Sequence, residues 1–600
     1  MSVTPKDETG QALLEEYTDT NEHDCVELEV TDIAENMLAT AEDAQQVDED
    51  DIASVVEDTT NHSEADFVVL GANPNTKTTR PTTPNKAEGQ HADGHPNDSS
   101  VVQDISHQIG AGLPGVGVAD SLWPILESFK GVTLLNGSYY FQGVASPEEI
   151  IRAASIARSI VRFTLTDNPE TTKQSIQTGT IIRLVQLLSP VMQGPLFPNL
   201  THLRVDGCGA SSADQLNLFL TPSLKQLNAT NIPDDRQDVL SVFLDTLAMI
   251  AKDMEHLALR GLTQTRQLLA CSNFERLLHL EIDGSVHISS QFLADVGRLP
   301  SLKSFHLGTT TSGTPVGSKL DSASNAVDMI SFLHLLKLHV IASPEVVKSL
   351  LGMVSSRLLS DLSLTFLWPE AAAGKPIVVR KRIRVAFLSN VPLILESALQ
   401  KWRETLKAVA ISIENAGEGS SPVPMVLAPT TLSLLMDLNL QRLKISQWTI
   451  HYSSDIVGNL LTAKWARLEA LSLPNGNNTF VTPSRLIEIA ERFPALVELH
   501  CALNFQELSN ESQPLGLPAN ALTHPLNFFT FWTTAPVEAA KLPNLARFID
   551  YLFPNLQKLE IMSNTDWLDG NQLKALLQLC QAVRKDDASR KPAGANAVRE

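Results

Sequence analysis

Cysteine is scarce in this sequence, and the spacing of the cysteines suggests no structural role for them. The five cysteines are scattered and none forms a C-x-x-C pair: Cys25, Cys208, Cys271, Cys501 and Cys580. This spacing argues against a disulfide framework and against a cysteine-based zinc site. Aromatic residues are also few, at 6%, although 43% of the residues are hydrophobic. A folded core must therefore consist mainly of leucine, isoleucine and valine.

Long apolar runs and a surplus of basic residues are missing as well. No run approaches the roughly 18 residues that a membrane span needs, and the N-terminus (MSVTPKDETG) lacks the features of a signal peptide. We therefore expect an intracellular protein, cytoplasmic or nuclear, without membrane contact. The net charge of −22 lies entirely in residues 1–120, which hold 26 acidic and 4 basic residues, whereas the remainder holds 42 of each. This balance predicts no nucleic-acid partner.

Recognisable catalytic motifs are absent too. The sequence contains no G-x-S-x-G, no H-E-x-x-H, no phosphate-binding loop and no kinase motif set. His334 and His339 flank one predicted strand, and their spacing does not place two ligands on one helix face. His91 and His95 have no third ligand nearby. We expect no enzymatic activity, no bound metal and no cofactor.

What the sequence does contain is a recurring pattern of the form L-x-x-L-x-L. Most intervals between units lie near the 20–29 residues of a leucine-rich repeat, and the longer ones fit repeats with insertions. Each unit predicts a short strand whose alternate apolar residues point into a core. Thirteen units begin at Ile160, Leu200, Leu224, Met254, Leu277, Leu302, Leu335, Leu359, Leu406, Leu440, Leu468, Leu496 and Leu556.

Helices are predicted between the strands, over residues 238–254, 344–354, 455–465 and 483–493. Each begins near a residue suited to cap it: Asp238, Ser343, Ser454 and Thr482. The alternation predicts an α/β fold, an irregular leucine-rich-repeat solenoid over residues 119–583. A doubly wound α/β domain alternates in the same way, but no glycine-rich phosphate loop follows any strand, so we favour the solenoid. The acidic region 1–118 and the polar tail 584–600 are predicted to be disordered.

Three long intervals are interpreted as loops: 309–325, 415–429 and 504–536. The segment 379–384 (VRKRIR) is the one basic cluster in the sequence. It could serve as a nuclear import signal or a site for an acidic partner. Because basic and apolar residues alternate there, we interpret 375–388 as a strand with one solvated face.

Several segments carry a resemblance to a known family. They are 196–205 (LFPNLTHLRV), 552–561 (LFPNLQKLEI), 492–496 (RFPAL) and 299–302 (LPSL), together with 121–127 (SLWPILE) leading into 157–165 (ARSIVRFTL). In these the chain resembles the F-box/leucine-rich-repeat-like proteins of mushroom-forming fungi, over about residues 121–583. In that family an N-terminal F-box docks onto a cullin-type ubiquitin ligase and the repeats present the substrate. Residues 1–120 contain no leucine-proline followed by an apolar helical run and a tryptophan, so no F-box is recognisable.

Two functions from this family and one from another class remain open. The resemblance implies a non-enzymatic protein-interaction scaffold related to ubiquitin-ligase substrate receptors. The alternative is a working receptor, in contact with ligase subunits, whose F-box has diverged or is missing. A hydrolase with a doubly wound fold is the remote alternative.

The repeats predict a surface for the protein partner. In a leucine-rich repeat, the residue between the last two apolar positions of each unit points to the open, concave face, and extended concave surfaces are what solenoids offer to partners. We predict partner contacts from Arg204, Asn228, Glu281, His306, His339, Lys444, His500 and Glu560. Ala258, Ser363, Ala410 and Ser472 occupy the equivalent position in their units.

A short motif in the acidic region is a second candidate site. Residues 63–70 (SEADFVVL) place an aromatic residue, two spacers and an aliphatic residue after acids. This pattern resembles motifs that bind ubiquitin-like modifiers by adding a strand to a sheet edge, with two side chains entering pockets. The residues that we expect to contact such a modifier are Glu64, Asp66, Phe67, Val68, Val69 and Leu70.

Overall fold

The computed structural model describes residues 117–590 apart from 136, 167–174, 208–214, 264–265, 310–330, 369–376, 416–424, 450–455, 475–479, 506–522, 534–536 and 563–569. All that follows concerns these residues, which belong to one compact unit. The predicted disorder of residues 1–118 falls almost wholly outside the described residues.

A single long sheet organises this unit, and every strand pair in it is parallel. Neighbours in the sheet follow one another in the sequence, and each predicted L-x-x-L-x-L unit carries one of its strands. The strands are β1 (Val118–Ala119), β4 (Arg162–Thr166), β6 (His202–Asp206), β7 (Gln226–Thr230), β8 (His256–Leu262), β9 (His279–Gly284), β10 (Ser304–Thr309), β11 (Lys337–Ala342), β12 (Asp361–Trp368), β13 (Ala408–Asn415), β15 (Arg442–Ser446), β17 (Ala470–Ser472), β19 (Glu498–Leu503), β20 (Phe528–Thr533) and β21 (Lys558–Met562), with β18 (Phe480–Val481) beside β19.

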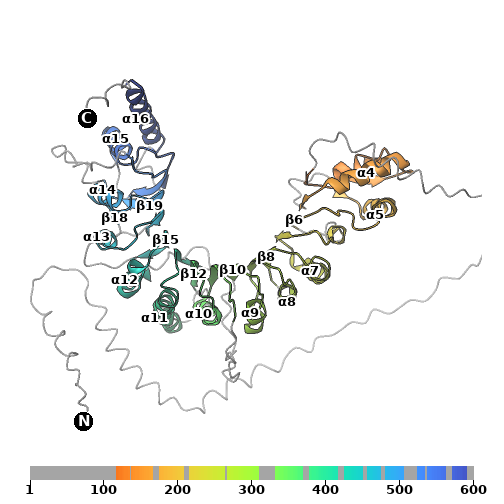
Figure 1. Ribbon diagram of the computed structural model, residues 1–600, viewed down its shortest axis with the longest axis horizontal. Helices are drawn as coiled ribbons and strands as arrows, with labels where there is room; N and C mark the ends of the chain where they lie inside the picture. Colours follow the sequence, from red (N-terminus) through yellow and green to blue (C-terminus); the bar gives the residue numbers. More distant parts are fainter. Residues whose placement is uncertain are drawn as a thin grey trace, which may run out of the picture. The chain divides into compact units, whose positions relative to one another are not determined.

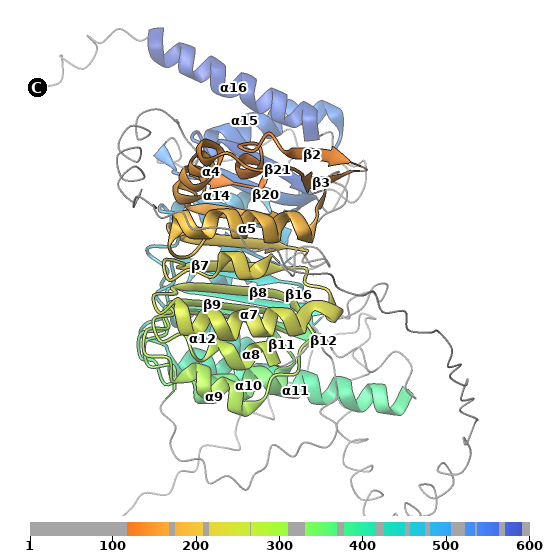
Figure 2. The ribbon, with the colours of Figure 1, turned by 90° about the vertical axis from the view of Figure 1, so that its right-hand side faces the viewer.

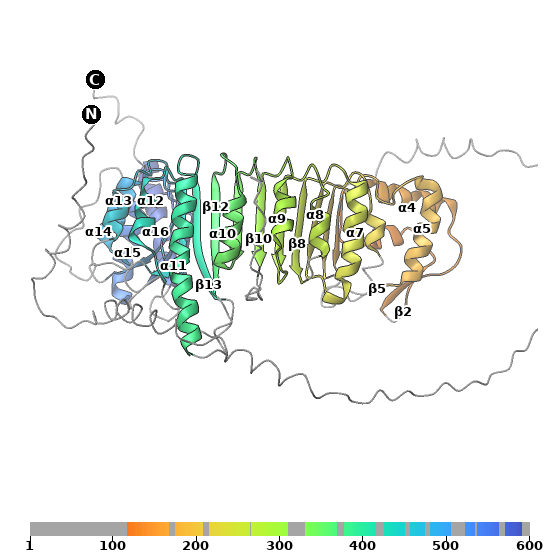
Figure 3. The same ribbon diagram turned by 90° about the horizontal axis from the view of Figure 1, so that it is seen from below.

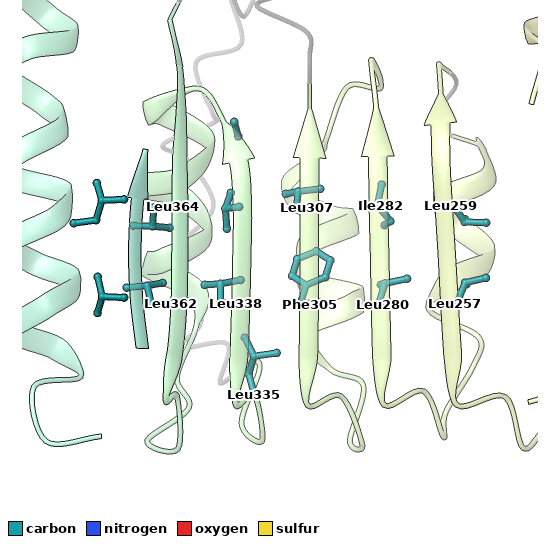
Figure 4. Close-up of a cluster of buried hydrophobic side chains, with 14 of the residues drawn as sticks. Leu257, Leu259, Leu280, Ile282, Phe305, Leu307, Leu335, Leu338, Leu362 and Leu364 are labelled. Atoms are coloured by element: carbon teal, nitrogen blue, oxygen red, sulfur yellow. The ribbon is translucent and has the colours of Figure 1, made fainter. Parts of the chain in front are cut away.

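Apolar side chains at alternate positions explain why these segments are strands. In β8, Leu257 and Leu259 are buried, and the next strand places Leu280 and Ile282 directly beside them. Figure 4 shows these side chains as a continuous ladder that runs from strand to strand. A side chain on a strand points to the face opposite its neighbour's. One face of the sheet is therefore apolar along its whole length, and the other carries mostly polar residues.

Helices cover the apolar face. Figures 1 and 3 show them on the outer side of the curved sheet, while the strands line the inner, concave side, and Figure 2 shows successive strands stacked as parallel rungs. The helices are α3 (Trp123–Leu126), α4 (Pro147–Ser159), α5 (Thr178–Met192), α7 (Gln237–Ile250), α8 (Arg266–Cys271), α9 (Ser290–Gly297), α10 (Pro344–Met353), α11 (Ile377–Lys401), α12 (Pro429–Asp437), α13 (Ile456–Leu461), α14 (Pro483–Arg492), α15 (Leu542–Leu552) and α16 (Gly570–Arg590). Short 3₁₀ turns join them at η2 (Leu216–Phe219), η3 (Asp234–Arg236) and η7 (Ala539–Lys541).

The N-terminal end of the array has a small sheet of its own. It consists of β2 (Val132–Leu135), β3 (Ser138–Phe141) and β5 (Ser175–Ile176). The following helix, α4, begins with a capping box in which the Ser146 side chain accepts from the Glu149 backbone N–H and Glu149 accepts from the Ser146 backbone N–H. A second small sheet pairs β14 (Met425–Val426) with β16 (Trp448–Thr449).

This topology confirms the leucine-rich-repeat solenoid and excludes the doubly wound alternative. A doubly wound sheet reverses its strand order at a switch point and carries helices on both faces. Here the order never reverses, and the helices occupy one side. None of the described helices combines the length and the apolar character that crossing a bilayer requires.

Two interpretations of the irregular segments are wrong. The long loop expected at 504–536 contains β20, because Leu526, Phe529 and Phe531 supply a repeat unit with aromatic residues in place of leucine, and all three are buried. The strand expected at 375–388 is instead part of α11. This segment is helical because Phe387, Val391 and further residues of α11 follow at helical spacing and are buried in the core. In the predicted loop 415–429, the short strand β14 precedes α12.

Of the four predicted helix caps, one forms the expected side-chain hydrogen bond. Thr482 caps α14, and its hydroxyl accepts from the Arg485 backbone N–H at 3.4 Å. Ser343 stands at the N-cap of α10 without a side-chain bond to the helix, and Asp238 lies inside α7. Ser454 lies outside the described residues.

At the C-terminal end, α16 continues to Arg590, so residues 584–590, which the sequence assigns to a disordered tail, are helical.

Candidate partner-binding face

One row of side chains runs across the concave face from the first repeat to the last. Each member stands between two apolar residues that are buried or, for Ile561, partly buried, and each is the direct cross-strand partner of the next. We call it the middle row. Its members are Thr164, Arg204, Asn228, Ala258, Glu281, His306, His339, Ser363, Ala410, Lys444, Ser472, His500, Thr530 and Glu560.

The middle row contains every residue that the sequence assigned to the concave face. The register is kept although the intervals between repeats differ, because insertions lie in the connections and not in the strands. The structure adds two members, Thr164 and Thr530, that the sequence reasoning missed. Thr530 belongs to the overlooked strand β20 and is buried, so it offers no surface to a partner.

A second row, which the sequence reasoning did not consider, lies two residues before the middle row on the same face. We call it the first row. Strand alternation could have identified it, because the residue before the first buried position of each strand must also face away from the core. Its members are Arg162, His202, Gln226, His256, His279, Ser304, Lys337, Asp361, Ala408, Arg442, Ala470, Glu498, Phe528 and Lys558.

Ion pairs neutralise most of the carboxylates on this face. Arg260 on β8 donates to Glu281 at 2.6 Å, and Arg442 reaches across β13 to Asp361 at 3.0 Å. Two further ion pairs within the rows and the next position along the strands are Arg204–Asp206 at 3.7 Å and Lys558–Glu560 at 2.7 Å. The His500 ring forms a hydrogen bond with Glu498 at 2.6 Å. The face is therefore polar but nearly balanced in charge.

Histidines form two stacked pairs near the middle of the face. The rings of His256 and His279 lie 4.2 Å apart with planes inclined by 7°, and those of His306 and His339 lie 4.1 Å apart at 21°. Burial lowers the pKa of His279 and of His306, and it lowers the pKa of His339 to about 4, with the neighbouring His306 contributing. In the free protein at neutral pH these three imidazoles are therefore uncharged.

Two shallow grooves follow the two rows. The first has a volume of about 420 Å³ and extends from β7 to β12 over both histidine pairs. The second, of about 640 Å³, extends from β12 to β20 and is lined by Lys444, Ser472, Glu498, His500 and Trp532 among others. A groove that crosses many parallel strands suits an extended chain or a protein surface better than a small molecule.

Metal binding and cysteine-based catalysis have little support in the described part of the chain. No three His, Cys, Asp or Glu side chains there come together as ligands for a metal ion. Cys271 and Cys501 are buried, and burial raises the pKa of both thiols, that of Cys271 to about 12. The thiolate is the reactive form of cysteine, so neither residue is suited to act as a nucleophile. The modifier motif at Glu64–Leu70 lies outside the described residues.

Comparisons with known proteins add little to this geometry. The chain matches no family model and no curated protein. Among solved structures it is similar to the leucine-rich repeat-containing protein LegL7 from Legionella pneumophila, with 11% identity over 72% of this chain and 94% of that one and a TM-score of 0.24. A protein from Bacteroides fragilis shows 10% identity over 62% of this chain and 69% of its own, with a TM-score of 0.20. The description of the fold therefore rests on this chain's own sheet.

Proposed function

We propose that this chain is a non-enzymatic interaction scaffold that binds a protein partner on the concave face of its repeat array. The observation that carries this proposal is the unbroken register of the middle row. It presents one line of mostly polar and partly exposed side chains across the sheet, while helices cover the opposite face. A rigid array of this kind offers a large prealigned surface, which reduces the entropic cost of binding.

Reversing charge on one face tests the proposal. Arg204 and Lys444 are exposed on the concave face, whereas Arg152 and Lys348 are exposed on helices α4 and α10. The tagged full-length chain, R204E/K444E and the matched control R152E/K348E would each be used to recover partners from lysate. We expect the control to recover the same proteins as the unmodified chain and R204E/K444E to lose them. Loss with the control but not with R204E/K444E would contradict the proposal.

A finer proposal concerns the class of scaffold. We propose that the repeats act like the substrate receptors of cullin-type ubiquitin ligases. The support is the sequence resemblance in units 196–205 and 552–561, which form β6 and β21 with the turns before them. Co-purification of a cullin subunit with the tagged full chain would favour a working ligase receptor. Recovery of the concave-face partner without any cullin subunit would leave a scaffold outside the ligase.

The motif at residues 63–70 supports a further partner, a ubiquitin-like modifier. Its acids precede an aromatic and an aliphatic residue at the spacing that fits two neighbouring pockets beside a sheet edge. The variant F67A/L70A removes both anchoring side chains. We expect it to lose recovered ubiquitin-like proteins and to keep the concave-face partner; unchanged recovery of those modifiers would dismiss the motif.

A further inference from the structure

The first groove differs from the rest of the concave face in the kind of residues that line it. Four of its lining side chains are the stacked histidines of β8, β9, β10 and β11, and Ser304 and Lys337 continue the first row beyond His279. His256 and His279 belong to the first row, and His306 and His339 belong to the middle row. The four imidazoles therefore form a diagonal band across adjacent strands.

The charges around this band are unequally matched. The groove holds two carboxylates, and each already has an arginine partner: Glu281 with Arg260 and Asp361 with Arg442. Lys337 also lines the groove; it is exposed and forms no ion pair with any described residue. The unmatched charge of the groove is therefore positive, and protonated histidines would add to it.

We infer that this groove binds an acidic peptide segment of a partner protein and takes up protons at its histidines as it does so, so that affinity rises as pH falls. The inference rests on the proposed function and specifies the chemistry of the partner. A carboxylate seated beside Lys337 would accept hydrogen bonds from protonated imidazoles, and such charge-assisted bonds are stronger than neutral ones.

The local electrostatics set the sign of the pH effect. Around His256 and His279, the charged and titratable groups are Glu255, His202, Lys303 and Lys337. Around His306 and His339, they are Arg260, Glu281, Asp283 and Lys444. Burial lowers the pKa of His279 and His339, and nearby cations act in the same direction. A bound carboxylate acts in the opposite direction. The complex therefore holds more protons than the free protein, and by linkage acid favours the complex.

Variants can remove the titration without disturbing the sheet. Gln226 occupies the first row directly beside His256, so glutamine is already accommodated at that position of the strand. H256Q/H279Q therefore keeps polar side chains of similar size. His287 and His334 are exposed outside the groove, and H287Q/H334Q removes the same number of histidines as a matched control.

The test measures binding of a fluorescently labelled oligoglutamate peptide to the full chain by anisotropy, at pH 7.5 and 5.5 and constant ionic strength. Glutamate has a pKa of about 4.3, so the charge of the probe changes little between these conditions. We expect about tenfold tighter binding at pH 5.5 for the unmodified chain and for H287Q/H334Q. One proton taken up corresponds to a tenfold change per pH unit, so tenfold over these two units corresponds to an average uptake of about half a proton. For H256Q/H279Q, which keeps His306 and His339, we expect a clearly smaller difference between the two pH values than for the unmodified chain, and for K337Q weaker binding at both.

Several results would overturn the inference. These are equal affinity at both pH values, equal binding of an oligoglutamine peptide, or unchanged pH dependence in H256Q/H279Q. Self-association in sedimentation velocity that the same variant abolishes would assign the groove to a second copy of the chain instead. If one of these results occurs while R204E/K444E still loses its partner, the scaffold proposal stands and only the inference of an acidic peptide ligand is wrong. If R204E/K444E keeps its partner, the scaffold proposal itself fails.

Discussion

His306 and His339 stack face to face across the neighbouring strands β10 and β11, with ring centroids 4.1 Å apart. They are direct partners in the register of the sheet, and the connection between their strands contains residues 310–330, the longest stretch within 117–590 that the structure does not describe. The contact is therefore set by the pairing of the strands and not by the length of what joins them. It brings two titratable groups together at the centre of the proposed binding face.

The first prediction concerns stability and pH. The pKa of His339 is lowered to about 4 by burial and by His306, whereas an unfolded histidine titrates near 6.5. The unfolded chain therefore binds the proton first, and stability present above pH 6.5 is lost as pH falls toward 4. At pH 5 we expect a loss of about 1 kcal/mol from this residue, after allowance for solvent screening at a partly open face.

Urea unfolding at pH 7.5 and pH 5 checks this prediction. H339Q should show a smaller loss of stability between the two pH values than the unmodified chain does. H334Q, which changes an exposed histidine just before the same strand, should keep the full loss. An H339Q protein with unchanged pH dependence would disprove the assignment.

The second prediction compares two buried tryptophans. Trp402 donates from its indole N–H to the Ser356 carbonyl at 2.8 Å, whereas the indole N–H of Trp448 has no hydrogen-bond partner among the described residues. W402F leaves a buried carbonyl without this donor and should lower the free energy of unfolding by about 1–3 kcal/mol beyond the loss of volume. W448F removes a donor that was already unpaired, so it should cost clearly less. Urea denaturation of both variants makes the comparison, and an equal or larger cost for W448F would show the reasoning to be wrong.

The third prediction uses two glycines in different surroundings. A Cβ on Gly284 would overlap the backbone of Leu262, where the pairing of β8 and β9 shifts register. G284A should therefore destabilise the fold by about 2 kcal/mol or more. Gly352 lies in α10 with open space around its missing side chain, so G352A should stabilise by about 0.5–1 kcal/mol. Opposite shifts of the thermal midpoint are expected, and a tolerated G284A would contradict the close packing described at the bulge.

The fourth prediction concerns the C-terminal helix. Arg584 in α16 donates to the backbone carbonyls of Asp550 and Pro554 and forms an ion pair with the Asp550 carboxylate at 3.1 Å. Burial raises the pKa of Asp550, so this carboxylate depends on its arginine. R584A should cost about 2–3 kcal/mol and increase cleavage within α16 by a protease. K585A, an exposed neighbour, should change neither; equal protease sensitivity in the two variants would mean that Arg584 does not hold the helix.

The leucine spacing was sufficient to predict the solenoid and the middle row. Repeat units such as Leu277–Ile282 place two inward leucine-like residues around one outward residue, and strand geometry then fixes which side chain faces the partner. Strand β20 was missed because Phe529 and Phe531 replace leucine, although both fill the same buried positions. The segment 379–384 was assigned to a strand because its local alternation outweighed the helical spacing that begins at Phe387.

The histidine band could not have been predicted from sequence. Each histidine looks like an ordinary outward residue of its own strand, and the repeat spacing does not show whether neighbouring rings stack or how deeply they are buried. The stacking of His256 on His279 depends on register between repeats, and the lowered pKa of His279 depends on its burial by neighbours from other strands. Neither the stacking nor the burial can be derived from the order of the residues alone.

Hydroxyl-radical footprinting of the complex with the recovered partner tests the central claim most directly. His306, His500 and Trp532 lie on the concave face, and Met249 and Leu269 are exposed on the helices of the opposite side. If the partner binds as proposed, oxidation of the first three residues falls in the complex while oxidation of Met249 and Leu269 is unchanged. Protection of Met249 and Leu269 with unaltered oxidation of the concave residues would contradict the account.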